Sequence, residues 1–207
     1  MNMLLKSAIA AAVFAVPSIA AASTWEIDPA HSSAKFTVKH MMITNVTGEF
    51  GNVTGTVNLD DKDPSKTSIT ASVDTTTINT NQAKRDAHLK SPDFFDVEKY
   101  PAMTFKSTSV KANGKEKFKV MGDLTLHGVT KPVTLDVESA STEIKDPWGG
   151  TRRGASATTK LNRKDFGLTW NQALETGGVA VSEDVNVTLD LQLVKKDAAP
   201  AAAPAKK

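Results

Sequence analysis

Histidine is the first residue type to consider as a source of chemistry, and the 207-residue sequence has four: His31, His40, His88 and His127. A histidine side chain can bind zinc or act as a general base near neutral pH. His31 and His40 flank one predicted strand and differ by an odd number of positions, so they point to opposite faces and cannot chelate one ion. A zinc site would need Asp or Glu ligands from elsewhere. One hypothesis is therefore a hydrolase or metal-dependent enzyme that uses His31, His88 or His127, and the other is that these residues make hydrogen bonds at turns and strand ends.

Other catalytic patterns are weak. The sequence has no Gly-x-Ser-x-Gly motif to present a nucleophilic serine, and it has no cysteine. Gly177 and Gly178 are not followed by the helix and lysine that a phosphate-binding loop requires. The 25 Lys and Arg balance 23 Asp and Glu without a basic block, which argues against a nucleic-acid partner. We therefore expect a binding protein and not an enzyme, with no cofactor and no metal.

The elements that position these residues are clearest between Lys117 and Val137. Apolar and polar residues alternate from Phe118 to Leu126 and again over residues 133–137, which is typical of strands with one buried face. Gly128 permits a turn between them. Pro132 is expected at the start of the returning strand, because proline cannot donate a ladder hydrogen bond. The stretch predicts an antiparallel hairpin.

About eight such strands are expected. Others fall at residues 34–38, 69–73, 103–110, 155–161 and 185–193, and residues 46–59 are expected to form one long strand that bends at a bulge at Gly51 and Asn52. Asn81 is the expected N-cap of a short helix over residues 82–90. Sequential antiparallel strands in this number form an up-and-down barrel or a sandwich. Inward positions rich in Val, Leu, Ala and Gly favour a hollow interior.

Both ends of the sequence are expected to lie outside this domain. Residues 1–22 have a basic start, a short apolar run and the small residues Ala20 to Ala22, which is typical of a signal peptide cleaved after Ala22. Residues 197–207 form a low-complexity Ala/Pro/Lys tail that is expected to be disordered. Residues 23–196 fit one domain. Since no second long apolar segment follows, we expect no integral membrane span and a periplasmic location.

Several blocks resemble the YceI-like family of exported lipid-binding proteins. They are TWEIDPAHSSAKFTVKHM with VTGEF after it, DAHLKSPDFFDVEKYPAMTF, GDLTLHGVTKPVTLDV and NRKDFGLTW, and together they span residues 25–194. The resemblance implies an eight-stranded antiparallel barrel, similar to that of lipocalins, with a long apolar tunnel. It also implies a polyisoprenoid, quinone-type or fatty-acyl ligand. Members of the family tend to pair, so it implies a homodimer as well.

The resulting hypothesis is an all-β, eight-stranded antiparallel lipocalin-like barrel with a short helical insertion. Its expected function is that of a periplasmic carrier for a long-chain isoprenoid (quinone-type or polyprenyl) or an acyl lipid. The inward residues expected to line the tunnel are Phe36, Val38, Phe105, Phe118, Val120, Leu124, Leu126, Leu135, Val187, Leu189 and Leu191. Those expected at its mouth are His31, His88, Arg163 and Asp165. A basic cluster of Arg152, Arg153, Arg163 and Lys164 is either a solvated rim or a contact for an anionic head group.

Overall fold

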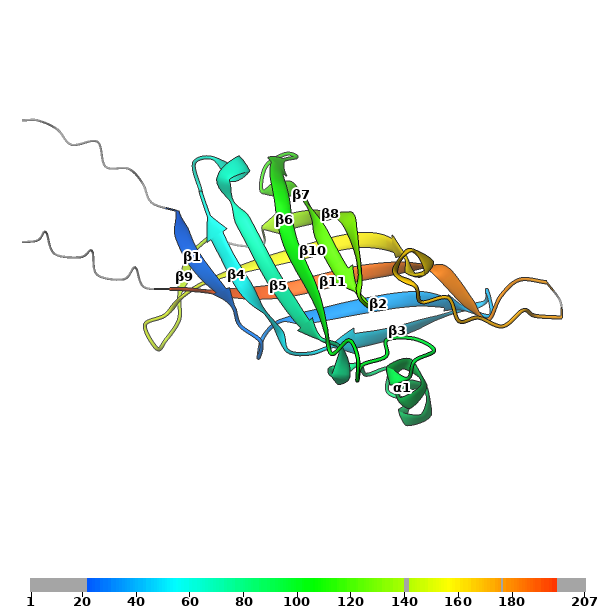
Figure 1. The fold of residues 1–207 in the computed structure, drawn as a ribbon. Coiled ribbons are helices and arrows are strands. Elements are labelled where there is room, and N and C mark those ends of the chain that lie inside the picture. Colours follow the sequence, from blue (N-terminus) through cyan, green and yellow to red (C-terminus); the bar gives the residue numbers. More distant parts are fainter. Residues whose placement is uncertain (1–21, 140–141, 176, 197–207) are drawn as a thin grey trace, which may run out of the picture.

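The computed structural model describes residues 22–139, 142–175 and 177–196. Within them, eleven strands form one antiparallel sheet. They are β1 (Ser23–Ile27), β2 (Ser33–His40), β3 (Thr44–Phe50), β4 (Val53–Leu59), β5 (Ser68–Asp74), β6 (Ala102–Ala112), β7 (Lys117–Leu126), β8 (Val129–Ser139), β9 (Ile144–Lys145), β10 (Thr151–Asn162) and β11 (Val181–Lys195). The helix α1 (Ala83–Lys90) and three 3-10 turns, η1 (Pro64–Lys66), η2 (Thr75–Thr77) and η3 (Arg163–Phe166), complete the set. Figure 1 shows the arrangement.

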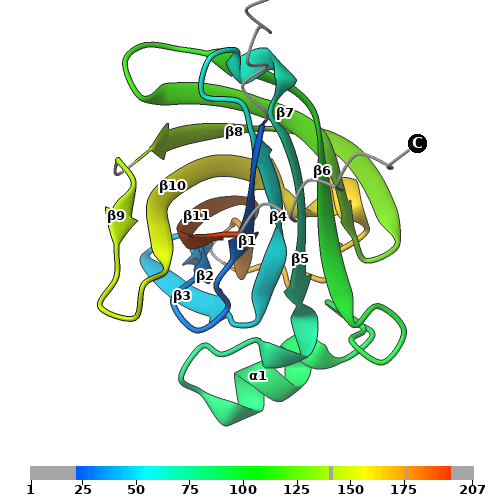
Figure 2. The same ribbon diagram turned by 90° about the vertical axis from the view of Figure 1, so that its left-hand side faces the viewer.

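Eight of these strands close into a ring. The order β11-β1-β4-β5-β6-β7-β8-β10 returns to β11 through the long β10–β11 pairing, and every pair in it is antiparallel. Figure 2 shows these strands arranged around the interior. Closure removes free sheet edges around most of the ring. The expected all-β fold, an eight-stranded antiparallel barrel with a short helix, is confirmed.

Strands β2 and β3 continue the sheet beyond this ring. The last part of β11 pairs with β1, whereas its first part pairs with β2, and β3 pairs with β2. The expected single strand over residues 46–59 is therefore wrong, because β3 ends at Phe50 and β4 begins at Val53 with a different pair of neighbours. Asn52 takes a positive φ of 52° between them. We call β2, β3 and their connecting turn the β2–β3 extension; it points toward the right-hand side of Figure 1.

The segment between β5 and β6 carries α1 and packs against the main apolar core. Ile78, Leu89 and Phe95 from this segment contact the cluster that contains Phe50 at the end of β3. The expected cap at Asn81 is wrong. The N-cap is Gln82, whose side chain accepts a hydrogen bond from the Arg85 N–H at 2.8 Å. A cap residue normally has extended backbone geometry, which Gln82 has (φ −147°), whereas Asn81 is left-handed (φ 60°).

The β7–β8 hairpin has a tighter turn than expected. Leu126 pairs with Val129, so only His127 and Gly128 form the loop, and their φ angles of 52° and 74° fit a two-residue type I′ turn. Pro132 does not begin the returning strand; it lies inside β8 opposite Asp123. The pairing of β8 with β10 covers only residues 136–139, so position 132 lies at a local sheet edge, where a proline is tolerated.

Two apolar clusters form the packed parts of the barrel. The larger is built around Trp25, which is fully buried beneath the charged groups of Arg153 and Lys195, each 5.3 Å from its ring centre. The smaller joins Phe166 and Leu168, from the segment after β10, to Leu126 at the end of β7. Other inward side chains are only half-buried, for example Leu189 and Leu191 on β11, which pack against the edge of the larger cluster. The barrel is therefore packed in places and open between them.

Candidate functional site

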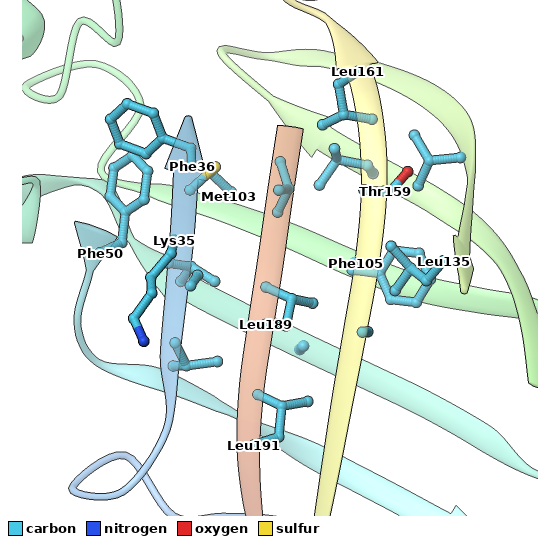
Figure 3. Close-up of a pocket in the computed structure, with 18 of the residues that line it drawn as sticks. Lys35, Phe36, Phe50, Met103, Phe105, Leu135, Thr159, Leu161, Leu189 and Leu191 are labelled. Atoms are coloured by element: carbon cyan, nitrogen blue, oxygen red, sulfur yellow. The ribbon is translucent and has the colours of Figure 1, made fainter. Parts of the chain in front are cut away.

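A cavity of about 810 Å³ occupies the barrel interior. Its volume lies in the upper part of the range of about 300–1,000 Å³ that is usual for small-molecule pockets. All eleven apolar residues expected inside the tunnel line it: Phe36, Val38, Phe105, Phe118, Val120, Leu124, Leu126, Leu135, Val187, Leu189 and Leu191. Figure 3 shows several of these side chains directed into one space from different strands.

Small residues opposite the leucines leave this space open. Leu189 pairs with Ala34 on β2 and with Ala157 on β10, and Leu191 pairs with Ala155. Because alternate residues of each strand face inward, these side chains share the interior with the leucines. The short alanine side chains do not fill the barrel, so the protein leaves an apolar cavity at its centre.

A group of aromatic residues closes one side of the cavity. The ring of Phe50 lies 5.5 Å from that of Phe36 and 5.3 Å edge-on from that of Phe95. Phe94 and Trp170 also line the cavity, with their ring centres 5.2 Å apart. Phe94, Phe95 and Trp170 are not among the residues that the sequence predicts for the site. They lie outside the regular strands, where no alternation indicates which way a side chain points.

The two ends of the cavity differ in charge. Lys84, Arg85 and His88 of α1 line one end. Asp60, Asp61 and Glu116, from the β4–β5 and β6–β7 connections, line the other together with Arg153. These connections and α1 lie on opposite sides of the barrel in Figure 1. At the α1 end Lys84 and Arg85 therefore offer cations to a bound head group, whereas the other end offers mainly carboxylates.

Of the four residues expected at the mouth, His88 and Arg163 line the cavity. The Nε2 atom of His88 lies 2.9 Å from Asp93 Oδ2, and its ring packs edge-on against Phe94 and Trp170 at 5.0 Å. Arg163 is buried, and its guanidinium donates hydrogen bonds to the backbone carbonyls of Leu168, Val181 and Ser182. Burial lowers the pKa of Arg163. Its donors hold the segment after β10 against β11 and do not face a ligand.

The other two, His31 and Asp165, lie outside the cavity lining. The His31 ring is exposed and bonds through Nδ1 to Asp28 Oδ2 at 2.8 Å. This bond, together with one from Arg152, holds the pKa of Asp28 down at about 2. Asp165 borders a separate outer depression beside Pro132. Neither position could be recognised from the sequence, because both lie in connections whose direction depends on the closed barrel.

The expected basic cluster does not exist as one patch. Arg152 and Arg153 begin β10, whereas Arg163 and Lys164 follow its other end. Their partners also differ: Arg152 pairs with Asp28 and Asp146, Arg153 with Asp61, and Lys164 with Glu183. Because β10 is extended, the two pairs of basic residues lie at its opposite ends, although they are close in sequence.

The comparisons with known proteins agree with this architecture. The YceI-like domain profile matches residues 25–193. The chain belongs to the YceI-like family. A UPF0312 protein of Vibrio cholerae is 41% identical over 160 residues, which cover 76% of this chain and 84% of the relative. Protein YceI of Escherichia coli O157:H7 is 42% identical over 151 residues, which cover 72% of this chain and 78% of the relative.

Solved structures of YceI-like and related proteins share the barrel. The YceI protein of Campylobacter jejuni is 30% identical, with a TM-score of 0.65 over 77% of this chain and 90% of its own. A polyisoprenoid binding domain from Saccharophagus degradans has a TM-score of 0.61 over 83% of this chain and 98% of its own. At 16% identity, this second likeness shows the fold alone.

The three histidines of the enzyme hypothesis are apart from one another in this YceI-like barrel. His31 bonds to Asp28 and His88 to Asp93, while His127 Nδ1 lies 3.3 Å from the carbonyl oxygen of Phe166. Across the described ranges, no three His, Asp or Glu side chains converge where they could hold a metal ion. No helix among the same residues is long and apolar enough to cross a bilayer.

Proposed function

We propose that this protein binds a long-chain isoprenoid, of quinone or polyprenyl type, or an acyl lipid inside the barrel and carries it in the periplasm without chemical change. The observation that carries the proposal is the apolar cavity of about 810 Å³. The description of the Saccharophagus degradans neighbour as a polyisoprenoid binding domain supports this ligand class. The likeness to a family whose members tend to pair adds a homodimer to the proposal.

The energetics favour a long ligand. Burying one CH₂ group contributes about 0.8 kcal/mol, so a chain of about ten carbons gains ~8 kcal/mol and one of about twenty carbons gains ~16 kcal/mol. Association costs about 4–15 kcal/mol in lost freedom, and ordering a flexible chain adds to that cost. A short chain would therefore be held weakly, whereas a long one leaves a surplus. The affinity therefore depends on the length of the ligand's apolar chain more than on its chemical detail.

The charge asymmetry supports one orientation. Lys84, Arg85 and His88 line the α1 end, so a polar or anionic head group would lie there with its tail pointing toward Arg153. Arg85 is held in place by hydrogen bonds from its guanidinium to the hydroxyl and carbonyl oxygens of Thr80, at 2.7 and 2.8 Å. A fixed cation at this position would favour the head group without needing to rearrange.

The test is to identify what the protein holds. The full-length chain, expressed with its leader and purified without detergent, is extracted with organic solvent and the extract is analysed by mass spectrometry. We expect a polyprenyl, quinone or acyl lipid in near-equimolar amount. Clean extracts, together with no uptake of an added polyprenyl or fatty-acyl probe, would refute the proposal.

The proposed periplasmic location is tested by a separate measurement. Export with cleavage after Ala22 should give a periplasmic protein whose intact mass begins at Ser23. Recovery of the full-length chain from the cytoplasm would contradict the periplasmic part of the proposal, and the lipid extract would still test the binding part. The residues before Ala22 lie outside the described structure.

A further inference from the structure

The turn of the β2–β3 extension exposes three consecutive large apolar side chains. Met41, Met42 and Ile43 are 44%, 53% and 74% exposed. Large apolar side chains that cluster at one exposed point are a sign of an interaction surface, whereas single ones are ordinary. We call these three residues the apolar tip. Figure 1 places the turn between β2 and β3 toward the end of the molecule that lies away from β1 and β9, beside the orange loop before β11, which projects further.

The backbone of the tip is held in a defined and uncommon conformation. Met41 and Met42 both have positive φ angles, 49° and 63°, which favour Asn or Gly over a long side chain. The Met41 N–H donates to the carbonyl oxygen of Ala180 at 2.7 Å, and the Ile43 N–H donates to that of His40 at 3.1 Å. Turn geometry therefore does not explain the choice of methionine here. The exposed side chains themselves need an explanation.

The tip is continuous with the lipid cavity. His40, one residue before it, lines the cavity, as do Ala180 and Val181 on the segment that binds the tip. Behind them, Val38 and Val46 continue the apolar lining toward the barrel interior. An alkyl chain that left the cavity along this wall would arrive at the tip.

The charges around the tip fit a lipid surface. Over residues 37–47 the ionisable side chains are Lys39 and His40, with no carboxylate; on the neighbouring segment Glu175 is exposed and Glu183 pairs with Lys164. A basic residue beside an apolar turn adds electrostatic attraction to anionic head groups, while the apolar side chains enter the interfacial region. We propose that the apolar tip docks the protein on a lipid bilayer and places this end of the cavity against it for lipid exchange. The exchange step rests on the proposed lipid-carrier function, whereas the docking step does not.

Docking is tested with vesicles of phosphatidylcholine, with and without phosphatidylglycerol, by co-sedimentation of the full chain. We expect Met42→Ser with Ile43→Ser to weaken binding by about tenfold or more, because two side chains lose their burial in the interface. The matched control is Trp148→Ser, since Trp148 is 86% exposed in the turn after β9, and β9 lies away from the β2–β3 turn in Figure 1. Equal losses in the tip variant and the control, or no loss in the tip variant, would overturn the proposal.

Exchange is tested by loading a fluorescent polyprenyl or acyl probe either from vesicles or from ethanol. The tip variant should load slowly from vesicles and normally from ethanol. Failure of every protein to load by either route, with vesicle docking intact, would refute the carrier function and leave docking supported. Light scattering measures the oligomeric state of wild type and of the tip variant. If wild type is a dimer that does not bind vesicles, and the tip variant is a monomer, then the tip is a contact between chains and the proposal is overturned.

Discussion

Narrowing the barrel with Leu189→Trp separates a hollow carrier from a solid core. Leu189 is half-buried, points into the cavity and is flanked by Ala34 and Ala157, so an indole at this position would extend into open space. An indole that excludes about three CH₂ groups of a bound chain removes ~2.4 kcal/mol of binding energy at about 0.8 kcal/mol each. This corresponds to roughly 50-fold weaker binding at about 1.4 kcal/mol per tenfold change.

The same substitution has a different consequence in a solid core. Overpacking costs about 1–3 kcal/mol, which lowers the Tm of a domain of this size by roughly 2–12 °C. In the hollow barrel we expect the Tm of lipid-free Leu189→Trp to stay within about 2 °C of wild type, with lipid absent from its organic extract. Thr188→Trp is the matched control, because Thr188 is the exposed neighbour on the same strand. A large loss of Tm in Leu189→Trp alone, with the lipid content unchanged, would refute the hollow-barrel reasoning.

Three further substitutions test the frame around the cavity. Gly128→Val should lower Tm by more than about 4 °C, because a β-branched residue at φ 74° costs about 1–2 kcal/mol and its Cβ would also lie 2.6 Å from the Tyr100 ring. The Tm of His127→Ala should fall by less than half as much. Equal losses of Tm in thermal melts of the two variants would contradict this reasoning. Asp28, with its pKa lowered from 3.8 to about 2, stabilises the fold as a carboxylate above pH 4 and loses that contribution as the pH falls through 2. The Tm deficit of Asp28→Asn should therefore be full at pH 7 and absent near pH 2, and a deficit that persists unchanged at pH 2 would count against the assignment.

The strands were largely predictable because their signal is local. Alternation of apolar and polar residues identifies a half-buried strand without knowledge of its neighbours, and this worked for β7, β8 and β11. The errors occurred where pairing decides the outcome. The break between Phe50 and Val53 separates strands with different neighbours, and Pro132 is accepted inside β8 because β10 does not pair with β8 at that position. Neither fact is contained in the local pattern.

The residues of the candidate site were likewise predictable on the strands but not in the connections. Inward residues were predictable from parity, and the eleven named from the sequence all line the cavity. The mouth was not predictable, since it is built from connections. Asp165 faces an outer depression, while Phe95 and Trp170, which the sequence analysis did not assign, reach the cavity from outside the strands. Arg163 illustrates a further difficulty: its charge suggested a ligand contact, but its partners are backbone carbonyls.

The open interior has a consequence for stability. Inward side chains such as Leu189 and Leu191 border the cavity on one side, so they make fewer contacts with other protein atoms than they would in a packed core. The fully buried Trp25 cluster and the cluster around Phe166 then hold the barrel together, with closure of the sheet. A ligand in the cavity contacts these side chains only in the folded state, so its binding stabilises that state. At 100 times its Kd it adds about 2.7 kcal/mol of stability, or roughly 5–11 °C in Tm. Loading with lipid should therefore raise the Tm of wild type clearly and the Tm of Leu189→Trp hardly at all, because the indole already occupies the part of the cavity that the lipid chain would fill.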